Sequence, residues 1–171
     1  MKTEVVIDPR ETGDSLNDKL AEAGAKLIVE ALPKIERGEL IPEKQRDEDS
    51  CYAKMLHKSM GQIDWRLSAK KLDCLIRGLL SWPGAYTGFR GKNLKIWEAE
   101  AVSTDRFALW QETAEAVDVA PGMVVGVEKE AFYVAAGEGV LKILAVQPEG
   151  KKRMAVKDFL LGYQIRNGEQ L

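Results

Sequence analysis

Five short segments rich in β-favouring residues most constrain what this chain can fold into. They are residues 85–90, 94–102, 122–128, 131–136 and 140–147. Residues 103–121 make one long connection between the second and third segments, and Gly137-Glu138-Gly139 predicts a hairpin turn before the fifth. Five short strands within about 60 residues, with one long connection, predict a small five-stranded antiparallel β-barrel of the OB type.

Two helices are predicted to flank these strands. The apolar stripe within residues 67–80 predicts a helix with Ser68 near its N-terminal cap. Trp82-Pro83-Gly84 is expected to stop it, because proline restricts the residue before it and glycine permits a sharp turn. Phe159-Leu160-Leu161 predicts a short second helix that Gly162 ends. Residues 63–171 are therefore predicted to form one barrel domain.

The first 37 residues predict only a strand and a helix. Val5-Val6-Ile7 before Asp8-Pro9 predicts a short buried strand, and Ser15 with Asp18 resembles a capping box that starts a helix. Pro33 is expected to kink or stop this helix, which closes by Gly38. Because these two elements cannot enclose a core, residues 1–37 are expected to be the last part of a larger α/β domain, in an α+β chain overall.

Residues 38–62 are predicted to be a linker between these two parts. From Gly38 to Ser50, seven of thirteen residues are charged and one is proline, a composition typical of a solvated segment. The same region holds His57, which lies near Ser59 without an obvious orienting carboxylate. A solvated linker histidine is therefore favoured over a catalytic triad.

Composition excludes several classes of protein. No apolar stretch approaches the roughly 18 residues of a membrane span, and the N-terminal residues lack a signal-peptide pattern. We therefore expect a cytoplasmic protein with no membrane partner. Cys51, Cys74 and His57 cannot supply the four ligands of a structural zinc site, so no metal is expected. Cys74 lies between Lys70 and Arg77, and a reactive thiol there is the less favoured alternative to an inert one.

Charge is segregated along the chain, although the formal net charge is only −2. Residues 62–97 carry a net charge of +5 and residues 139–166 a net charge of +4, whereas residues 98–138 carry −7. If the fold brings the two basic stretches together, they form a positive surface suited to a polyanion.

The basic stretches supply the candidate nucleic-acid-binding residues. In Gln147-Pro148-Glu149-Gly150-Lys151-Lys152-Arg153-Met154, a turn is expected to present three consecutive cations just before a helix. The full candidate set is Arg66, Lys70, Lys71, Arg77, Arg90, Lys92, Lys95, Lys151, Lys152 and Arg153. The aromatic residues interleaved with these cations are Trp82, Tyr86, Phe89 and Trp97. For Trp82 and Trp97, packing in the barrel core or against a helix is favoured over base stacking.

Six segments make the chain resemble a known family when they are read in order. They are Ile63-Asp64-Trp65, Ile76-Arg77-Gly78, Trp82-Pro83-Gly84-Ala85-Tyr86-Thr87, Lys95-Ile96-Trp97, Gly137-Glu138-Gly139-Val140-Leu141 and the Gln147–Met154 segment. Together they resemble the carboxy-terminal half of the methionyl-tRNA formyltransferase family. Residues 12–20 are similar to the last helix of that family's formyl-transfer domain. The resemblance covers nearly the whole chain.

The resemblance implies an enzyme that moves a formyl group from 10-formyltetrahydrofolate to methionyl initiator tRNA. In that family the catalytic Asn, His and Asp and the folate pocket lie in the amino-terminal domain, and the Asn-x-His and Ser-Leu-Leu-Pro signatures are absent here. We therefore expect a carboxy-terminal portion with a Rossmann-like remnant at 1–37. It should bind the tRNA backbone without bound cofactor and be inactive alone.

Two alternatives stay open from the sequence. Relatives of the formyl-transfer fold act on other substrates, so the chain could belong to another formyltetrahydrofolate-dependent transferase or hydrolase. It could instead be a stand-alone interaction module that forms a homodimer through the helix of residues 15–32, whose apolar face needs a partner.

Overall fold

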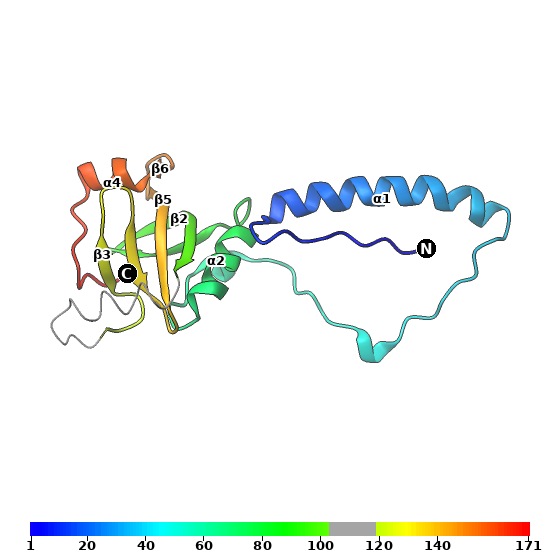
Figure 1. Cartoon of the computed structure of the whole chain (residues 1–171), viewed down its shortest axis with the longest axis horizontal. Helices are drawn as coiled ribbons and strands as arrows, with labels where there is room; N and C mark the ends of the chain where they lie inside the picture. Colours follow the sequence, from blue (N-terminus) through cyan, green and yellow to red (C-terminus); the bar gives the residue numbers. More distant parts are fainter. Residues whose placement is uncertain (103–118) are drawn as a thin grey trace. The chain divides into compact units, whose positions relative to one another are not determined.

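The computed structural model describes residues 1–102 and 119–171 (Figure 1). Most of the predicted connection 103–121, and with it the centre of the acidic stretch 98–138, lies outside the described residues. The chain forms two compact units, Met1–Leu56 and His57–Leu171.

The amino-terminal unit is built on one long helix, α1 (Gly13–Glu36). Its capping box joins Thr12 and Ser15, so the helix begins earlier than the predicted pair of Ser15 and Asp18 would place it. The helix also continues past Pro33 for most of a turn. Proline lacks a donor but keeps its carbonyl, which accepts a 3.2 Å hydrogen bond from the amide of Arg37. Gly38, with a φ of 71°, then ends the helix as expected.

The predicted strand Val5-Val6-Ile7 is wrong. These residues form no strand, and the side chains of Val6 and Ile7 are 79% and 65% exposed. A strand needs a partner for its amide and carbonyl groups, and no described segment of this unit pairs with residues 5–7. Residues 38–56 are irregular apart from one 3-10 turn, Asp47–Asp49.

The carboxy-terminal unit contains one antiparallel sheet (Figure 1). Its strands are β1 (Ala85–Phe89), β2 (Lys92–Val102), β3 (Val124–Val127), β4 (Phe132–Ala135), β5 (Val140–Pro148) and β6 (Met154–Ala155). The spatial order is β1-β2-β5-β4-β3, and β6 pairs with β5. The five predicted strands are therefore confirmed, and the two-residue strand β6 is an addition.

The sheet is not closed, so the predicted OB-type barrel is not confirmed. No strand pairing joins β1 to β3 within the described residues, because other segments occupy both outer edges. Ile63 donates its amide to the carbonyl of Tyr86 on β1 (2.8 Å). On β3, Val124 exchanges two backbone hydrogen bonds of 2.8 Å with Gly168 and Glu169 of the carboxy-terminal tail. Short non-strand segments thus form hydrogen bonds with the backbone of β1 and β3, the two outer strands that a closed barrel would have paired with each other.

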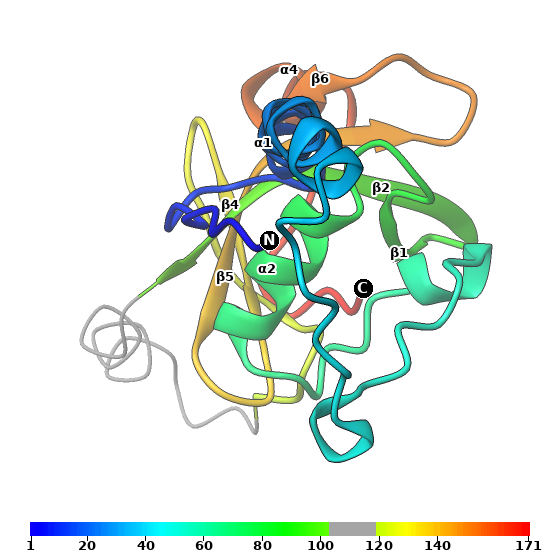
Figure 2. The same cartoon turned by 90° about the vertical axis from the view of Figure 1, so that its right-hand side faces the viewer.

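Helices α2 (Ala69–Gly78) and α4 (Val156–Gly162) flank the sheet, and α2 packs beside β2 and β5 (Figure 2). Ser68 caps α2 by accepting a hydrogen bond from the amide of Lys71, as predicted. The helix ends at Gly78, before Trp82 is reached, and α4 ends at Gly162 as expected. A 3-10 helix, Lys58–Gly61, opens the unit.

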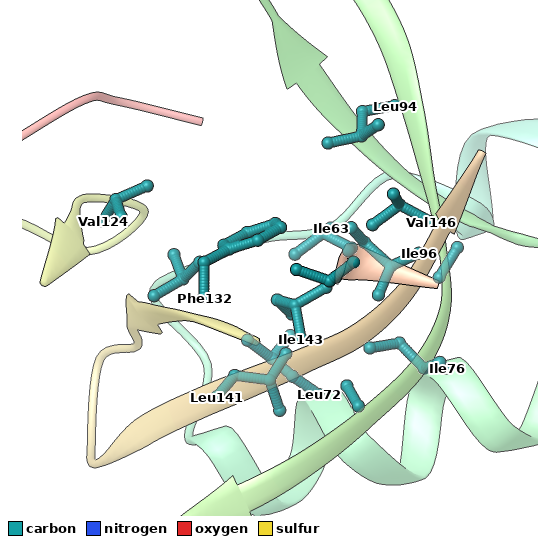
Figure 3. Close-up of a cluster of buried hydrophobic side chains, with 14 of the residues drawn as sticks. Ile63, Leu72, Ile76, Leu94, Ile96, Val124, Phe132, Leu141, Ile143 and Val146 are labelled. Atoms are coloured by element: carbon teal, nitrogen blue, oxygen red, sulfur yellow. The ribbon is translucent and has the colours of Figure 1, made fainter. Parts of the chain in front are cut away.

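The core gathers apolar side chains from α2, α4 and strands β1 to β5. Figure 3 shows part of this cluster, where Leu72 and Ile76 of α2 lie near Ile143 of β5. Leu72 of α2, Phe132 of β4, Ile143 of β5 and Phe159 of α4 are all completely buried. Gly137 ties the β4–β5 turn to the chain before α2, since its amide donates to the carbonyl of Trp65 at 2.7 Å. The start of α2 therefore lies at the β4–β5 end of the sheet.

Candidate nucleic-acid interface

Strand register brings the two basic stretches together at one end of the sheet. Lys95 on β2 lies opposite Tyr86 on β1 and Gln147 on β5. Directly opposed residues in an antiparallel pair point to the same face, so these three side chains form a row across the sheet. Lys92, at the start of β2, and the β5–β6 turn that follows Pro148 lie at this same end.

The β5–β6 turn, residues 149–153, holds its cations in a hydrogen-bonded loop. The amide of Lys151 donates to the carbonyl of Pro148 at 3.0 Å, and Gly150 supplies the positive φ of 72° that the turn needs. Glu149 is joined to β2 twice: its amide donates to the carbonyl of Asn93, and its carboxylate accepts from the amide of Asn93, both at 3.0 Å. The turn that carries the three exposed cations is thus tied to the sheet.

A second set of contacts joins this turn to Trp97. The indole Nε1 of Trp97 donates to Oε1 of Gln147 at 3.0 Å, and Nε2 of Gln147 donates to the carbonyl of Lys151 at 2.8 Å. The guanidinium of Arg153 lies 5.3 Å from the centre of the Trp97 ring. Trp97 and Trp82 lie outside the core clusters, and Trp82 is 47% exposed, so the predicted core packing is wrong for both.

We call the cations at this end the basic turn patch. Its members are Lys92, Lys95, Lys151, Lys152 and Arg153. All five are exposed, and Arg153 forms an ion pair of 3.6 Å with Glu98. Within residues 1–102 and 119–171 the four lysines of the patch form no ion pair. None of the described carboxylates therefore neutralises these four lysines.

Three other predicted cations lie at the opposite end of the sheet. Arg66, Lys70 and Lys71 lie near the β4–β5 turn, where Ser68 forms a bridge with Glu138. The nine residues of β5 separate this end from the basic turn patch by about 30 Å. Arg66 also donates two hydrogen bonds of 2.8 Å to Asp64, and these lower the pKa of Asp64.

Arg77 and Arg90, the remaining predicted cations, are engaged within the fold. Arg77 of α2 forms an ion pair of 3.3 Å with Asp73, and both side chains are largely buried. Arg90, which follows β1, forms a 2.8 Å ion pair with Glu169 of the tail and donates to the carbonyl of Gln164. The hydrogen bonds from Arg90 lower the pKa of Glu169. Phe89, whose ring Arg90 covers at 4.7 Å, belongs to the core.

The other predicted reactive groups do not assemble into a site. His57 Nδ1 lies 2.6 Å from the hydroxyl of Ser59, and the side chains of both are exposed. Cys74 is exposed beside Arg77, whose guanidinium lies 3.4 Å from its sulfur. Among the described residues, no three His, Cys, Asp or Glu side chains are grouped as metal ligands. None of the described helices has the length and apolar character to cross a membrane.

Sequence reasoning missed the supporting roles of Gln147, Glu149 and Asn93. The segment 147–154 singles out the turn, but nothing local predicts that Gln147 reaches Trp97, 50 residues away in sequence.

Comparison with known proteins places the chain among formyltransferases. Residues 55–164 match the family described as "Formyl transferase, C-terminal domain". Methionyl-tRNA formyltransferase of Lachnospira eligens is 44% identical over the whole chain and 52% of its own length. That of Bacillus subtilis is 40% identical over 99% of the chain and 50% of its length. The chain thus spans about half the length of these curated relatives and matches their carboxy-terminal half.

Solved structures share the fold at low sequence identity. A variant of HypX from Aquifex aeolicus aligns with a TM-score of 0.58 at 18% identity, over 91% of this chain and 27% of that one. HypX in complex with tetrahydrofolic acid aligns with a TM-score of 0.50 at 20% identity, over 79% of this chain and 22% of that one.

Proposed function

The chain belongs to the formyl transferase C-terminal domain family, and from this membership we propose that its basic turn patch binds the phosphate backbone of methionyl initiator tRNA. The observation that carries the proposal is the convergence of Lys92 and Lys95 with the cations of the β5–β6 turn at one end of the sheet. Two stretches that are distant in sequence supply one positive surface.

The chemistry of the patch suits a polyanion better than a small ligand. Its cations are exposed to solvent, so they can approach several phosphates along a backbone. Double-helical RNA presents its phosphates and 2′-hydroxyls to such a surface, whereas its base edges in the deep groove are out of reach. The proposed surface therefore positions tRNA and leaves discrimination of its sequence to another part of the enzyme.

Formyl transfer itself is proposed for the complete enzyme, in the cytoplasm, with 10-formyltetrahydrofolate as donor. The hollow of about 510 Å³ beside Trp65 does not fit this donor, because its two charged groups, Asp64 and Arg66, already pair with each other. We propose that this chain alone neither binds the folate nor transfers formyl groups.

A salt titration of tRNA binding tests the proposal. The variant Lys151→Ala/Lys152→Ala/Arg153→Ala should bind more weakly, and the slope of log affinity against log salt should flatten by roughly 0.7–0.9 for each phosphate that is no longer neutralised. The matched control Arg66→Ala/Lys70→Ala/Lys71→Ala removes three cations from the opposite end and should keep most of the slope. The reverse result would move the RNA surface to that end.

Comparison of initiator with elongator tRNA tests whether this surface binds tRNA without discriminating its sequence. Phosphate contacts carry little sequence information, so the chain should bind both with similar affinity and show no formyl transfer to charged initiator tRNA. Tight binding that is specific for initiator tRNA would contradict the proposal. Formyl transfer by the chain alone would require a catalytic site in it.

A second proposal concerns α1, which we propose forms a homodimer contact. Ile28, Leu32 and Ile35 recur at helical spacing and are 51%, 56% and 57% exposed, so the helix carries an uncovered apolar stripe. Sedimentation at several concentrations tests this. A monomer at every concentration would exclude the dimer.

A further inference from the structure

The side chain of Gln147 joins the sheet to the far side of the basic turn. Its amide group accepts from the indole of Trp97 (3.0 Å) and donates to the carbonyl of Lys151 (2.8 Å). Glu149 ties the near side of the same turn to Asn93. The two side chains therefore hold the turn at both ends, and Gln147 holds the part that carries the cations.

Trp97 is placed for this contact by an irregularity in β2. Ile96 pairs with Val146, Glu98 with Ala145 and Ala99 with Ile143, so the register shifts at Trp97 and shifts back one pair later, and Trp97 has no paired residue on β5. Irregular pairing of this kind changes the direction of side chains locally. At this position the indole of Trp97 donates to Gln147, and the guanidinium of Arg153 lies over its ring, 5.3 Å from the centre.

We propose that Gln147, anchored by Trp97, is a positioning residue that holds the basic turn in its RNA-binding conformation before RNA arrives. This inference rests on the proposed function of the patch. A turn that is already ordered loses less conformational entropy on binding than a mobile one, so fixing it raises affinity. Gln147 is uncharged and need not touch RNA itself.

This role has a signature that distinguishes it from a direct phosphate contact. Loss of a cation reduces both the affinity and the salt slope, because fewer counterions are released. Loss of the Gln147 bridge leaves every charge in place. The affinity should fall while the salt slope stays the same.

The test uses the full chain with Gln147→Met, which keeps the volume of the side chain but removes both hydrogen bonds. Binding of tRNA should weaken by about threefold to tenfold, the range expected for one or two hydrogen bonds, with an unchanged salt slope. Amide hydrogen exchange should accelerate at residues 149–153. Gln164→Met, at an exposed glutamine of the tail, is the matched control and should change neither.

Trp97→Phe provides a second, milder variant that keeps an aromatic ring beneath Arg153 and removes only the N–H donor. Its effect should point in the same direction as that of Gln147→Met. Because both changes break the same hydrogen-bonded chain, the double variant should lose less affinity than the product of the two single effects.

A variant that lacks the cations of the turn distinguishes a positioning role of Gln147 from a general loss of stability. In Lys151→Ala/Lys152→Ala/Arg153→Ala, the added Gln147→Met change should no longer weaken binding. An equal loss in both backgrounds, or an unchanged affinity in the wild-type background, would overturn the inference alone. A wild-type chain that binds no tRNA would overturn the proposed function and this inference with it.

Discussion

Each of the two units is stabilised by a different kind of interaction. Along α1 only Ala31 is buried, and ion pairs one turn apart, such as Glu22 with Lys26, are local. The carboxy-terminal unit buries side chains that come from distant parts of the chain, including Leu72, Phe132 and Phe159. The structure of the amino-terminal unit therefore rests on local interactions within one helix, whereas the stability of the carboxy-terminal unit comes from the packing of apolar side chains that are distant in sequence.

Truncation of a core side chain should show this contrast most strongly. Phe132→Ala leaves a cavity among completely buried residues, so the free energy of unfolding of the carboxy-terminal unit should fall by about 3–5 kcal/mol. Val29→Ala, at a 71% exposed position of α1 that the proposed dimer contact does not use, should change stability by less than about 0.5 kcal/mol. Urea unfolding of each variant measures both values, and similar losses would break the comparison.

Alanine in place of glycine should have opposite effects in the two units. A Cβ at Gly137 would lie 1.9 Å from the carbonyl oxygen of Arg66, so the backbone must shift, at a cost of about 1–3 kcal/mol. A Cβ at Gly24 of α1 meets nothing within 4 Å. Gly24→Ala should therefore raise helicity, with a gain of roughly 0.5–1 kcal/mol. Thermal unfolding followed by circular dichroism distinguishes the two.

The tail that covers the edge of β3 should respond to acid through Glu169. Hydrogen bonds from Arg90 lower the pKa of Glu169 in the folded chain, so the pair stabilises the fold above the unfolded pKa of about 4.3. This contribution, roughly 0.5–1 kcal/mol, is lost as the pH falls through the lowered folded pKa. Glu169→Gln should remove this part of the pH dependence in denaturant titrations. An unaltered pH profile would show that Arg90 does not hold the tail.

The smallest and most local effect is expected at the start of α1. Hydrogen bonds from Lys19 and Ser15 lower the pKa of Glu11 to about 2. The contribution of Glu11 should be complete above its unfolded pKa of about 4.3 and be lost as the pH falls toward 2. Carbon-13 NMR of the carboxyl group measures this pKa. Glu11→Gln should fray the first turn of α1 and leave unfolding of the carboxy-terminal unit unchanged.

Local patterns in the sequence predicted much of the carboxy-terminal unit. All five strands lie within two residues of their predicted limits, and Ser68 caps α2 as expected. The same kind of local pattern predicted the turn at Gly150 and the end of α4 at Gly162. These features depend on residues close in sequence, since alternation, turn chemistry and capping act over a few positions.

Tertiary structure alone decided which candidate cations share a surface. Strand register brought Lys95 beside Gln147 and left Arg66, Lys70 and Lys71 at the other end of the sheet. It also engaged Arg90 with the tail. Such neighbours depend on pairing between residues more than 50 positions apart, and local sequence patterns do not specify which of these residues pair.

The amino acid sequence by itself therefore determined the local elements, the basic turn and the family resemblance. The open sheet, the unpaired residues 5–7 and the contact of Gln147 with Trp97 were decided only by tertiary structure. The physical reason is that a strand edge or a polar side chain takes whichever partner the rest of the fold brings within hydrogen-bonding distance.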